Sequence, residues 1–570
     1  MFGFLTSGPR EITDPLESVK AASVWLRGLP AQDVIGRQQA VMAAFDSVRK
    51  ARRPLDPPRI QALLFLDAAL GADRRQLVKQ YVENADGGTQ LAQRIWKAAF
   101  DLSQGYENAY QSILEQALLQ SNNPRWKPLV PLLFARLIHY YGTDAKLRVF
   151  RYERWIPAKW VELHHTYMRA TELGIDRVPT TLGHGPNTTQ WTIEQEYVFV
   201  LLTHQLNTGN MTPAELDWAY AQIRGWSRRL SLDAVARSME GFMVDVGGKT
   251  GLVRPAGNDA GLMLRYLDTT PLCDQLDKAI AALRKAETSE QSGTLSVNER
   301  RIAILEKIRP AIAPNLNANL RRDPRSACGV TARVRVGLTR ICHELALNAK
   351  KDSAPAEAVN SDRIEHEQIE VYTIADVAPP KRRVRDEHDT IAASLSSFDD
   401  PMWHVKDRSI AGLRIGATGG VGQALTLGAL VAVRQSDVSE WLLGIVRRLN
   451  KLSPDEVEGG LAIIADNVVP VTLHTKREGK PEMGGFVVNG VDVSTIGARF
   501  DALYLPPPSR PDKPLHVKTV IVPTSEYGEG RNVILATGRS IYTIAFRHLI
   551  EQRADWSWCA IQIAEKKSRV

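Results

Sequence analysis

The pattern of hydrophobic and polar positions changes in character about two thirds of the way along the chain. Before residue 350, apolar residues recur every three or four positions, as they do on the buried face of an amphipathic helix. One such run joins Leu129, Leu133, Leu137 and Tyr140, and Gly142 follows where a helix commonly ends. The first part of the chain is therefore expected to be helical.

Two short motifs predict where helices begin. Thr192 is followed three residues later by Gln195, and Thr212 is followed in the same way by Glu215. This spacing is a capping box, in which the two side chains satisfy backbone N–H groups that the first turn leaves unpaired. Pro213 suits the first helical position, where its missing N–H costs nothing. We expect helices to start directly after Thr192 and Thr212.

Beyond a polar stretch, the chain changes to short runs rich in Val, Ile and aromatic residues, separated by Gly, Pro or charged turns. This pattern is typical of small antiparallel barrels. The runs include GLRIGA, ALVAV, WLLGIVRRL, GLAII, PVTLHT, ALYLP, HVKTVIVP and NVILAT. Their combined length exceeds the needs of one small barrel, which predicts two. A helix is expected near 542–553, followed by a last strand, WCAIQI.

These patterns predict an α+β multidomain protein, with an α-helical N-terminal region followed by C-terminal antiparallel β-barrels. The expected parts are helical domains at 1–175 and 176–348, a linker at 349–368, a barrel at 369–470 and a second small barrel at 471–570.

Composition narrows the functional classes only slightly. The chain has 44% hydrophobic and 24% charged residues, as ordinary globular proteins do, and its net charge of +8 is mild for 570 residues. The four cysteines form no CxxC pair, which disfavours a structural zinc site or a disulfide framework and favours a reducing compartment. The N-terminus lacks the pattern of a signal peptide, and no apolar run is long enough to span a bilayer. We therefore expect a cytoplasmic protein.

One segment combines residues suited to an anionic ligand with guanine bases. A basic loop, KRRVRDE, precedes the sequence DRSIAG and several strand-like runs. Arginine binds phosphate bidentately and also the O6/N7 edge of guanine, while a short Asp-x-Ser accepts hydrogen bonds and Gly permits close backbone approach. The candidate ligand-binding residues are Lys381, Arg382, Arg383, Arg385, Asp407, Ser409 and Gly412.

The order of a basic loop, a D-x-S-x-x-G motif and two outgoing strands resembles the PilZ family, over roughly residues 375–470. The resemblance implies a six-stranded barrel that binds cyclic di-GMP. The second motif of the family is matched without substitution. The first motif, R-x-x-x-R, is matched in spacing by Lys381 and Arg385, with lysine in place of the first arginine.

The resemblance implies a cyclic di-GMP receptor rather than an enzyme, without cofactor or metal, acting on an unidentified protein partner through the helical region. Bacterial motility, attachment and exopolysaccharide control are the processes it implies. One alternative is an NAD(P)-binding Rossmann-type oxidoreductase, because a GATGGVG turn follows a strand. Its glycines are Gly416, Gly419, Gly420 and Gly422. The other alternative is a degenerate PilZ-like scaffold that binds no nucleotide.

A second basic stretch lies before the linker. Its members are Arg321, Arg322, Arg325, Arg333, Arg335 and Arg340. Nucleic-acid binding is not expected there, because no aromatic residues are interleaved with the arginines, and the stretch is interpreted as a solvated helix face.

Overall fold

The computed structural model describes most of the chain. The described residues are 14–50, 55–85, 89–120, 123–182, 190–236, 240–255, 263–287, 297–315, 324–352, 403–419, 425–436, 438, 440–453, 455–476, 487–488, 491–492, 496–509, 515–536 and 540–568. They fall into two compact units, residues 1–320 and 321–570, and each is treated by itself below.

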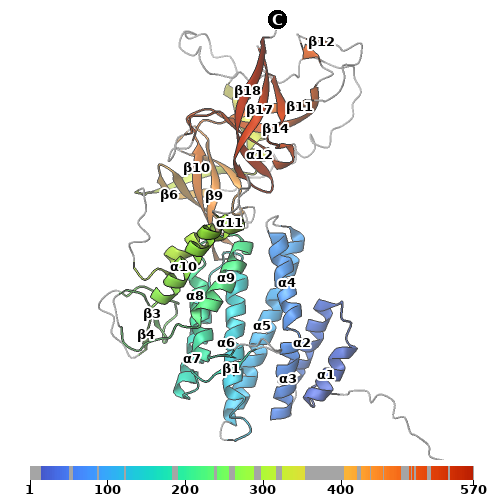
Figure 1. Ribbon diagram of the computed structural model, residues 1–570, viewed down its shortest axis with the longest axis vertical. Helices are drawn as coiled ribbons and strands as arrows, with labels where there is room; N and C mark the ends of the chain where they lie inside the picture. Colours follow the sequence, from blue (N-terminus) through green and yellow to red (C-terminus); the bar gives the residue numbers. More distant parts are fainter. Residues whose placement is uncertain are drawn as a thin grey trace, which may run out of the picture. The chain divides into compact units, whose positions relative to one another are not determined.

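The first unit is helical, as the sequence predicts (Figure 1). Its helices are α1 (Val19–Gly28), α2 (Val34–Lys50), α3 (Pro57–Ala69), α4 (Gly71–Asn84), α5 (Gln90–Leu119), α6 (Val130–Val149), α7 (Pro157–Glu172), α8 (Ile193–Gln205), α9 (Pro213–Ser227), α10 (Thr270–Glu287) and α11 (Val297–Ile312). Two short hairpins join them, β1 (Thr180–Thr181) with β2 (Gln190–Trp191), and β3 (Phe242–Asp245) with β4 (Leu264–Leu267).

The predicted capping boxes are confirmed at both positions. Thr192 accepts a hydrogen bond from the backbone of Gln195, whose side chain accepts one from the Thr192 backbone, and α8 begins at the next residue. Thr212 and Glu215 make the same reciprocal pair at the start of α9. A capping residue of this kind stabilises a helix by about 1 kcal/mol, and here it fixes both helix starts.

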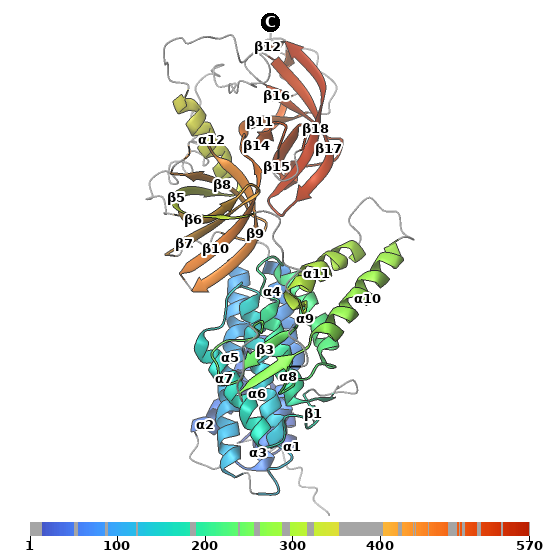
Figure 2. The same ribbon diagram turned by 90° about the vertical axis from the view of Figure 1, so that its left-hand side faces the viewer.

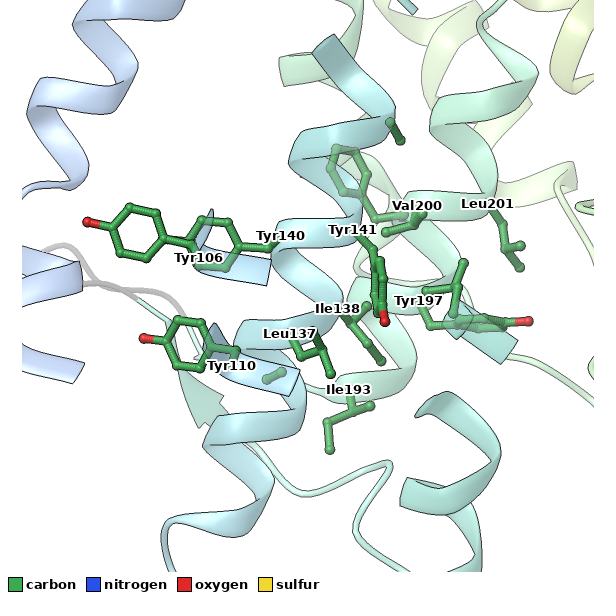
Figure 3. Packing of buried hydrophobic residues seen from close by; sticks show 14 of the residues in the cluster. Tyr106, Tyr110, Leu137, Ile138, Tyr140, Tyr141, Ile193, Tyr197, Val200 and Leu201 are labelled. Atoms are coloured by element: carbon green, nitrogen blue, oxygen red, sulfur yellow. The ribbon is translucent and has the colours of Figure 1, made fainter. Parts of the chain in front are cut away.

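One hydrophobic core runs through the whole first unit, from Leu16 to Ile312, so the expected division into two helical domains at residue 175 is wrong. Figure 3 shows α6 between α5 and α8, with side chains from all three helices in contact. Gly142 lies inside α6 instead of ending it, because α8 packs closely there. A Cβ at Gly142 would lie 3.1 Å from Cγ2 of Val200, so the glycine serves close helix packing.

A buried carboxylate lies inside this core. Asp67 of α3 is fully buried between two guanidinium groups, with Arg74 at 2.5 Å and Arg136 at 3.1 Å. The hydroxyl groups of Tyr110 and Tyr140 donate to its two oxygens. Burial alone would raise the pKa of Asp67, but the two arginines and the two hydroxyls outweigh burial and lower it. The carboxylate therefore stays ionised and joins α3, α4, α5 and α6.

A second buried carboxylate, Glu196 of α8, is held in the same way. It accepts hydrogen bonds from Arg224 of α9, and Nδ1 of His139 of α6 lies 3.6 Å from Oε2. Burial would raise the pKa of Glu196, but Arg224 and then His139 outweigh this effect and lower the pKa to about 2.

This pKa predicts part of the acid sensitivity of the helical unit. The stabilisation from ionised Glu196 is complete above the ordinary pKa of 4.5 and is lost as the pH falls from there toward 2. We expect Glu196→Gln to be less stable than wild type at pH 7 but to lose less stability between pH 4.5 and 2, measured as the thermal midpoint of the helical circular dichroism signal. The exposed Glu83→Gln variant is the control, and an unchanged pH profile in Glu196→Gln would contradict the assignment.

The second unit contains a six-stranded closed antiparallel barrel (Figure 2). Its strands are β5 (Ser326–Val336), β6 (Trp403–Ser409), β7 (Gly412–Thr418), β8 (Leu430–Gln435), β9 (Leu442–Ser453) and β10 (Glu456–Ala465), in the order β10-β7-β6-β5-β8-β9. Inward side chains such as Val334, Val405 and Ile415 are buried and fill the barrel.

The first barrel begins earlier than the sequence predicts. Its first strand, β5, lies within the basic stretch that was interpreted as a helix face, and it pairs with β6 and β8. The expected boundary at residue 369 is therefore wrong. Arginines alternate with buried residues here because β5 is a strand with one face inward, as at Arg333 and Val334. Helix α12 (Leu338–Asp352) and residues 353–402 are inserted between β5 and β6.

A second closed barrel follows, as predicted. Its strands are β11 (Val469–Lys476), β14 (Ile496–Leu505), β15 (Thr519–Pro523), β16 (Asn532–Ala536), β17 (Ser540–Gln552) and β18 (Trp556–Ser568), with a small hairpin of β12 (Val487–Val488) and β13 (Val491–Asp492). The helix expected near 542–553 is instead strand β17. Its burial pattern is irregular because the β17–β18 pairing contains several register shifts, which obscure the alternation of a strand.

The two barrels have the same strand connectivity. In each, the first strand pairs with the second and fourth, the third pairs with the sixth, and the fifth pairs with the fourth and sixth. One buried cluster joins them around α12. It contains Leu338, Ile341, Cys342 and Leu345 of α12, Leu430, Leu443 and Ile445 of the first barrel, and Leu503, Leu505, Ile521, Trp556 and Trp558 of the second. Arg447 of β9 adds a bidentate ion pair with Glu551 of β17, at 2.6 and 2.5 Å.

Candidate ligand-binding site

The β6–β7 hairpin brings together three of the predicted site residues. Ser409 ends β6 and pairs with Gly412, the first residue of β7, and its hydroxyl donates to the Gly412 carbonyl at 3.4 Å. A Cβ at position 412 would lie 2.8 Å from the carbonyl oxygen of Leu461 on β10. Only glycine fits this approach of β7 to β10. Asp407 lies two residues before Ser409 on the same strand.

A bulge in β6 directs the side chains of this site. Val405 pairs with Ile415 and Asp407 pairs with Arg414, so Lys406 is the extra residue between the two pairs. A bulge interrupts the alternation of side chains along a strand. Lys406 consequently reaches Glu458 on β10, beyond β7, while Asp407 contacts Arg414 on β7 itself.

The carboxylate of Asp407 is held by two arginines, one on each oxygen. Arg325, directly before β5, donates to Oδ1 at 2.5 Å, and Nε of Arg414 on β7 lies 2.8 Å from Oδ2 as an ion pair. Nη2 of Arg325 also lies 3.8 Å from the position of a Cβ on Gly412. The Asp407 side chain is 12% exposed, whereas Arg325 is 30% and Arg414 is 46% exposed. Two accessible guanidinium groups thus surround the D-x-S-x-x-G residues.

Two carboxylates of β10 complete a charged cluster. Nζ of Lys406 lies 2.6 Å from Glu458 and 3.2 Å from Glu456, and Glu458 is also 3.9 Å from Arg414. The hydrogen bond that Lys406 donates to Glu458 is the main reason that the pKa of Lys406 is raised. Together with Arg325 and Asp407, the cluster pairs three cations with three carboxylates across strands β6, β7 and β10 and the start of β5.

Arg325 contacts the motif residues but is not among the candidates predicted from the sequence. Arg321 and Arg325 have the R-x-x-x-R spacing of the PilZ family's first motif, with arginine at both positions. Arg325 and Asp407 are 82 positions apart, because the insertion after β5 lies between them in the sequence. They are in contact because β5 pairs with β6 in the barrel. Arg321 lies outside the described residues. So do Lys381, Arg382, Arg383 and Arg385, which the structure therefore leaves untested.

The corresponding face of the second barrel is apolar. In each barrel the second and third strands pair with each other. The third residue pair from the connection between these strands is Asp407–Arg414 in the first barrel and Leu503–Ile521 in the second. Leu503 and Ile521 are fully buried in the cluster that joins the barrels. The charged site therefore occurs on the first barrel alone among the described residues.

The Rossmann alternative does not fit the described strands. Gly416 lies in β7, which pairs antiparallel with β6 and β10, and Gly419 directly follows that strand. Gly420 and Gly422 lie outside the described residues. The next strand, β8, is antiparallel to both of its neighbours, whereas a dinucleotide-binding unit needs a parallel strand after a crossover helix.

The described residues contain no group of three or more His, Cys, Asp or Glu side chains able to hold a metal ion. None of the helices in the described part of the chain is long and apolar enough to cross a membrane.

Comparison with known proteins concerns the N-terminal part of the chain. Residues 20–237 match the family described as the N-terminal domain of the cyclic-di-GMP receptor FimW. The match covers α1 to α9 of the helical unit and ends before the barrels. A search of curated proteins gave no match.

Proposed function

We propose that this chain is a non-enzymatic receptor for cyclic di-GMP, which it binds on the outer face of the first barrel in the manner of PilZ domains. The observation that carries the proposal is the convergence of Arg325 and Arg414 on Asp407, beside Ser409 and Gly412. The similarity of the helical unit to the FimW N-terminal domain supports the same ligand independently of the barrel.

The geometry suits the two kinds of group in the ligand. The exposed guanidinium of Arg325 binds a phosphate or the O6/N7 edge of guanine bidentately, and this bond replaces its present bond to Asp407. Asp407 then accepts from the N–H groups of a guanine base. Gly412 lets β7 approach β10 closely beside Ser409, because a Cβ there would lie 2.8 Å from the Leu461 carbonyl oxygen.

In this proposal the R-x-x-x-R motif is Arg321–Arg325, because Arg325 donates a hydrogen bond to Asp407. A second set of donors to the dianion is proposed at Lys381, Arg382, Arg383 and Arg385. The receptor acts in the cytoplasm on a protein partner that contacts the helical unit. The bound ligand changes the arrangement of the barrels and that unit, in the control of motility, attachment or exopolysaccharide production.

Isothermal titration of the full chain tests the proposal. We expect saturable binding of cyclic di-GMP to one class of site, because the second barrel has Leu503 and Ile521 where the first has Asp407 and Arg414. GTP and NADH are the control ligands and should give no comparable heat. No binding of cyclic di-GMP at high micromolar concentration would refute the proposed function, and binding of NADH instead would restore the dinucleotide-enzyme alternative.

A further inference from the structure

Arg414 holds a position that the D-x-S-x-x-G motif does not include. It lies two residues after Gly412, on the outer face of β7 between the inward Leu413 and Ile415. Its Nε lies 2.8 Å from Oδ2 of Asp407, and its Nη1 lies 3.9 Å from Oε2 of Glu458, so it forms ion pairs with both carboxylates. Nearly half of the side chain is exposed. The guanidinium group is thus at the surface, next to the three motif residues.

The contacts of Arg414 with carboxylates resemble those that it would make with a phosphate. A guanidinium group binds planar carboxylate and tetrahedral phosphate oxygens through the same fork of N–H donors. In the described structure, carboxylates occupy this fork on two sides, from β6 and from β10. An incoming phosphate must compete with Glu458 for Arg414, and it is also repelled by the negative charge of Glu458.

Glu458 differs in this respect from its neighbour Glu456. Both are on β10 and both contact Lys406, but of these two described glutamates only Glu458 is within ion-pair distance of Arg414. Glu458 is also the less exposed of the two, at 14% against 37%. A partly buried pair is screened less by solvent, so Glu458 restrains Arg414 more strongly than a surface carboxylate would.

We propose that Arg414 binds a phosphate of the ligand, and that Glu458 limits ligand affinity by holding Arg414 in the unliganded protein. This inference rests on the proposed function and adds a ligand-binding residue and an affinity-setting residue to it.

Titration of cyclic di-GMP into matched variants tests the inference. We expect Arg414→Ala to weaken binding about tenfold or more, because a hydrogen bond to a charged group is lost. Arg414→Lys, which keeps the charge but not the fork, should weaken it by a smaller factor. Arg408→Ala is the control, since Arg408 is exposed on the same hairpin and the variant changes the charge equally. Glu458→Gln should tighten binding by more than Glu456→Gln does.

Each result has a clear meaning. If wild type binds the ligand and Arg414→Ala binds it with the same affinity as Arg408→Ala, Arg414 has no ligand role. The proposed function stands in that case. If Glu458→Gln binds no more tightly than Glu456→Gln, Glu458 does not restrain Arg414. If wild type itself does not bind, both the function and this inference fail. Equal thermal midpoints of the variants show that the barrel is intact.

Discussion

Replacing Arg325 by alanine is expected to weaken cyclic di-GMP binding by about a hundredfold or more. A hydrogen bond to a charged group contributes about 1.5–3 kcal/mol, and a bidentate contact loses two such bonds, while each 1.4 kcal/mol is a factor of ten. The variant should stay folded, because Asp407 keeps its bond to Arg414. Isothermal titration of the ligand into the variant measures the loss.

Arg385→Ala is the matched control, because it removes the same side chain from the other candidate motif. If the motif is Arg321–Arg325, this variant should lose much less affinity than Arg325→Ala. The opposite result, a large loss at Arg385 and none at Arg325, would place the motif at Lys381–Arg385 instead. Equal large losses would mean that both segments contact the ligand.

Removing the buried carboxylate in Asp67→Ala should destabilise the helical unit by about 3–5 kcal/mol. The change leaves Arg74 and Arg136 buried without their counter-ion, and breaking one side of a buried ion pair has this cost. Tyr110 and Tyr140 also lose their hydrogen-bond acceptor. The thermal midpoint of the helical circular dichroism signal should fall accordingly.

The exposed pair Lys97–Asp101 on α5 gives the comparison. Both side chains are more than half exposed, and solvent-exposed pairs of this kind contribute about 0–1 kcal/mol. Asp101→Ala should therefore leave the thermal midpoint almost unchanged. A small effect at Asp67, similar to that at Asp101, would contradict the structural role assigned to the buried network.

The features predicted correctly from sequence depend on neighbouring residues. The capping boxes at Thr192 and Thr212 are complete within four residues, and strand runs such as GLRIGA carry their own alternation and glycine boundaries. The residues of the D-x-S-x-x-G motif lie close together for the same reason. All three of its residues belong to one hairpin, so their spacing in sequence fixes their spacing in space.

The errors arose where distant parts of the chain decide the structure. Gly142 was expected to end a helix, but its role depends on Val200, which packs against α6 from α8. Strand β5 was interpreted as helical because its partners, β6 and β8, come only after the insertion. Arg325 was missed for the same reason. Arg321 and Arg325 have the R-x-x-x-R spacing directly before β5, but this spacing indicates a barrel motif only if the following residues form a strand and not a helix.

The insertion between β5 and β6 has a consequence for how the protein matures during synthesis. β5 emerges from the ribosome before either of its partner strands, and α12 emerges before β11 and β14, against which it packs. The cluster around α12 is completed only by Trp556 and Trp558 on the last strand. Such long-range pairing slows folding, because a long loop must close before its contacts form. The helical unit is therefore expected to fold first. Strand β5 is expected to fold only after the other strands of both barrels are synthesised, in one cooperative step with them.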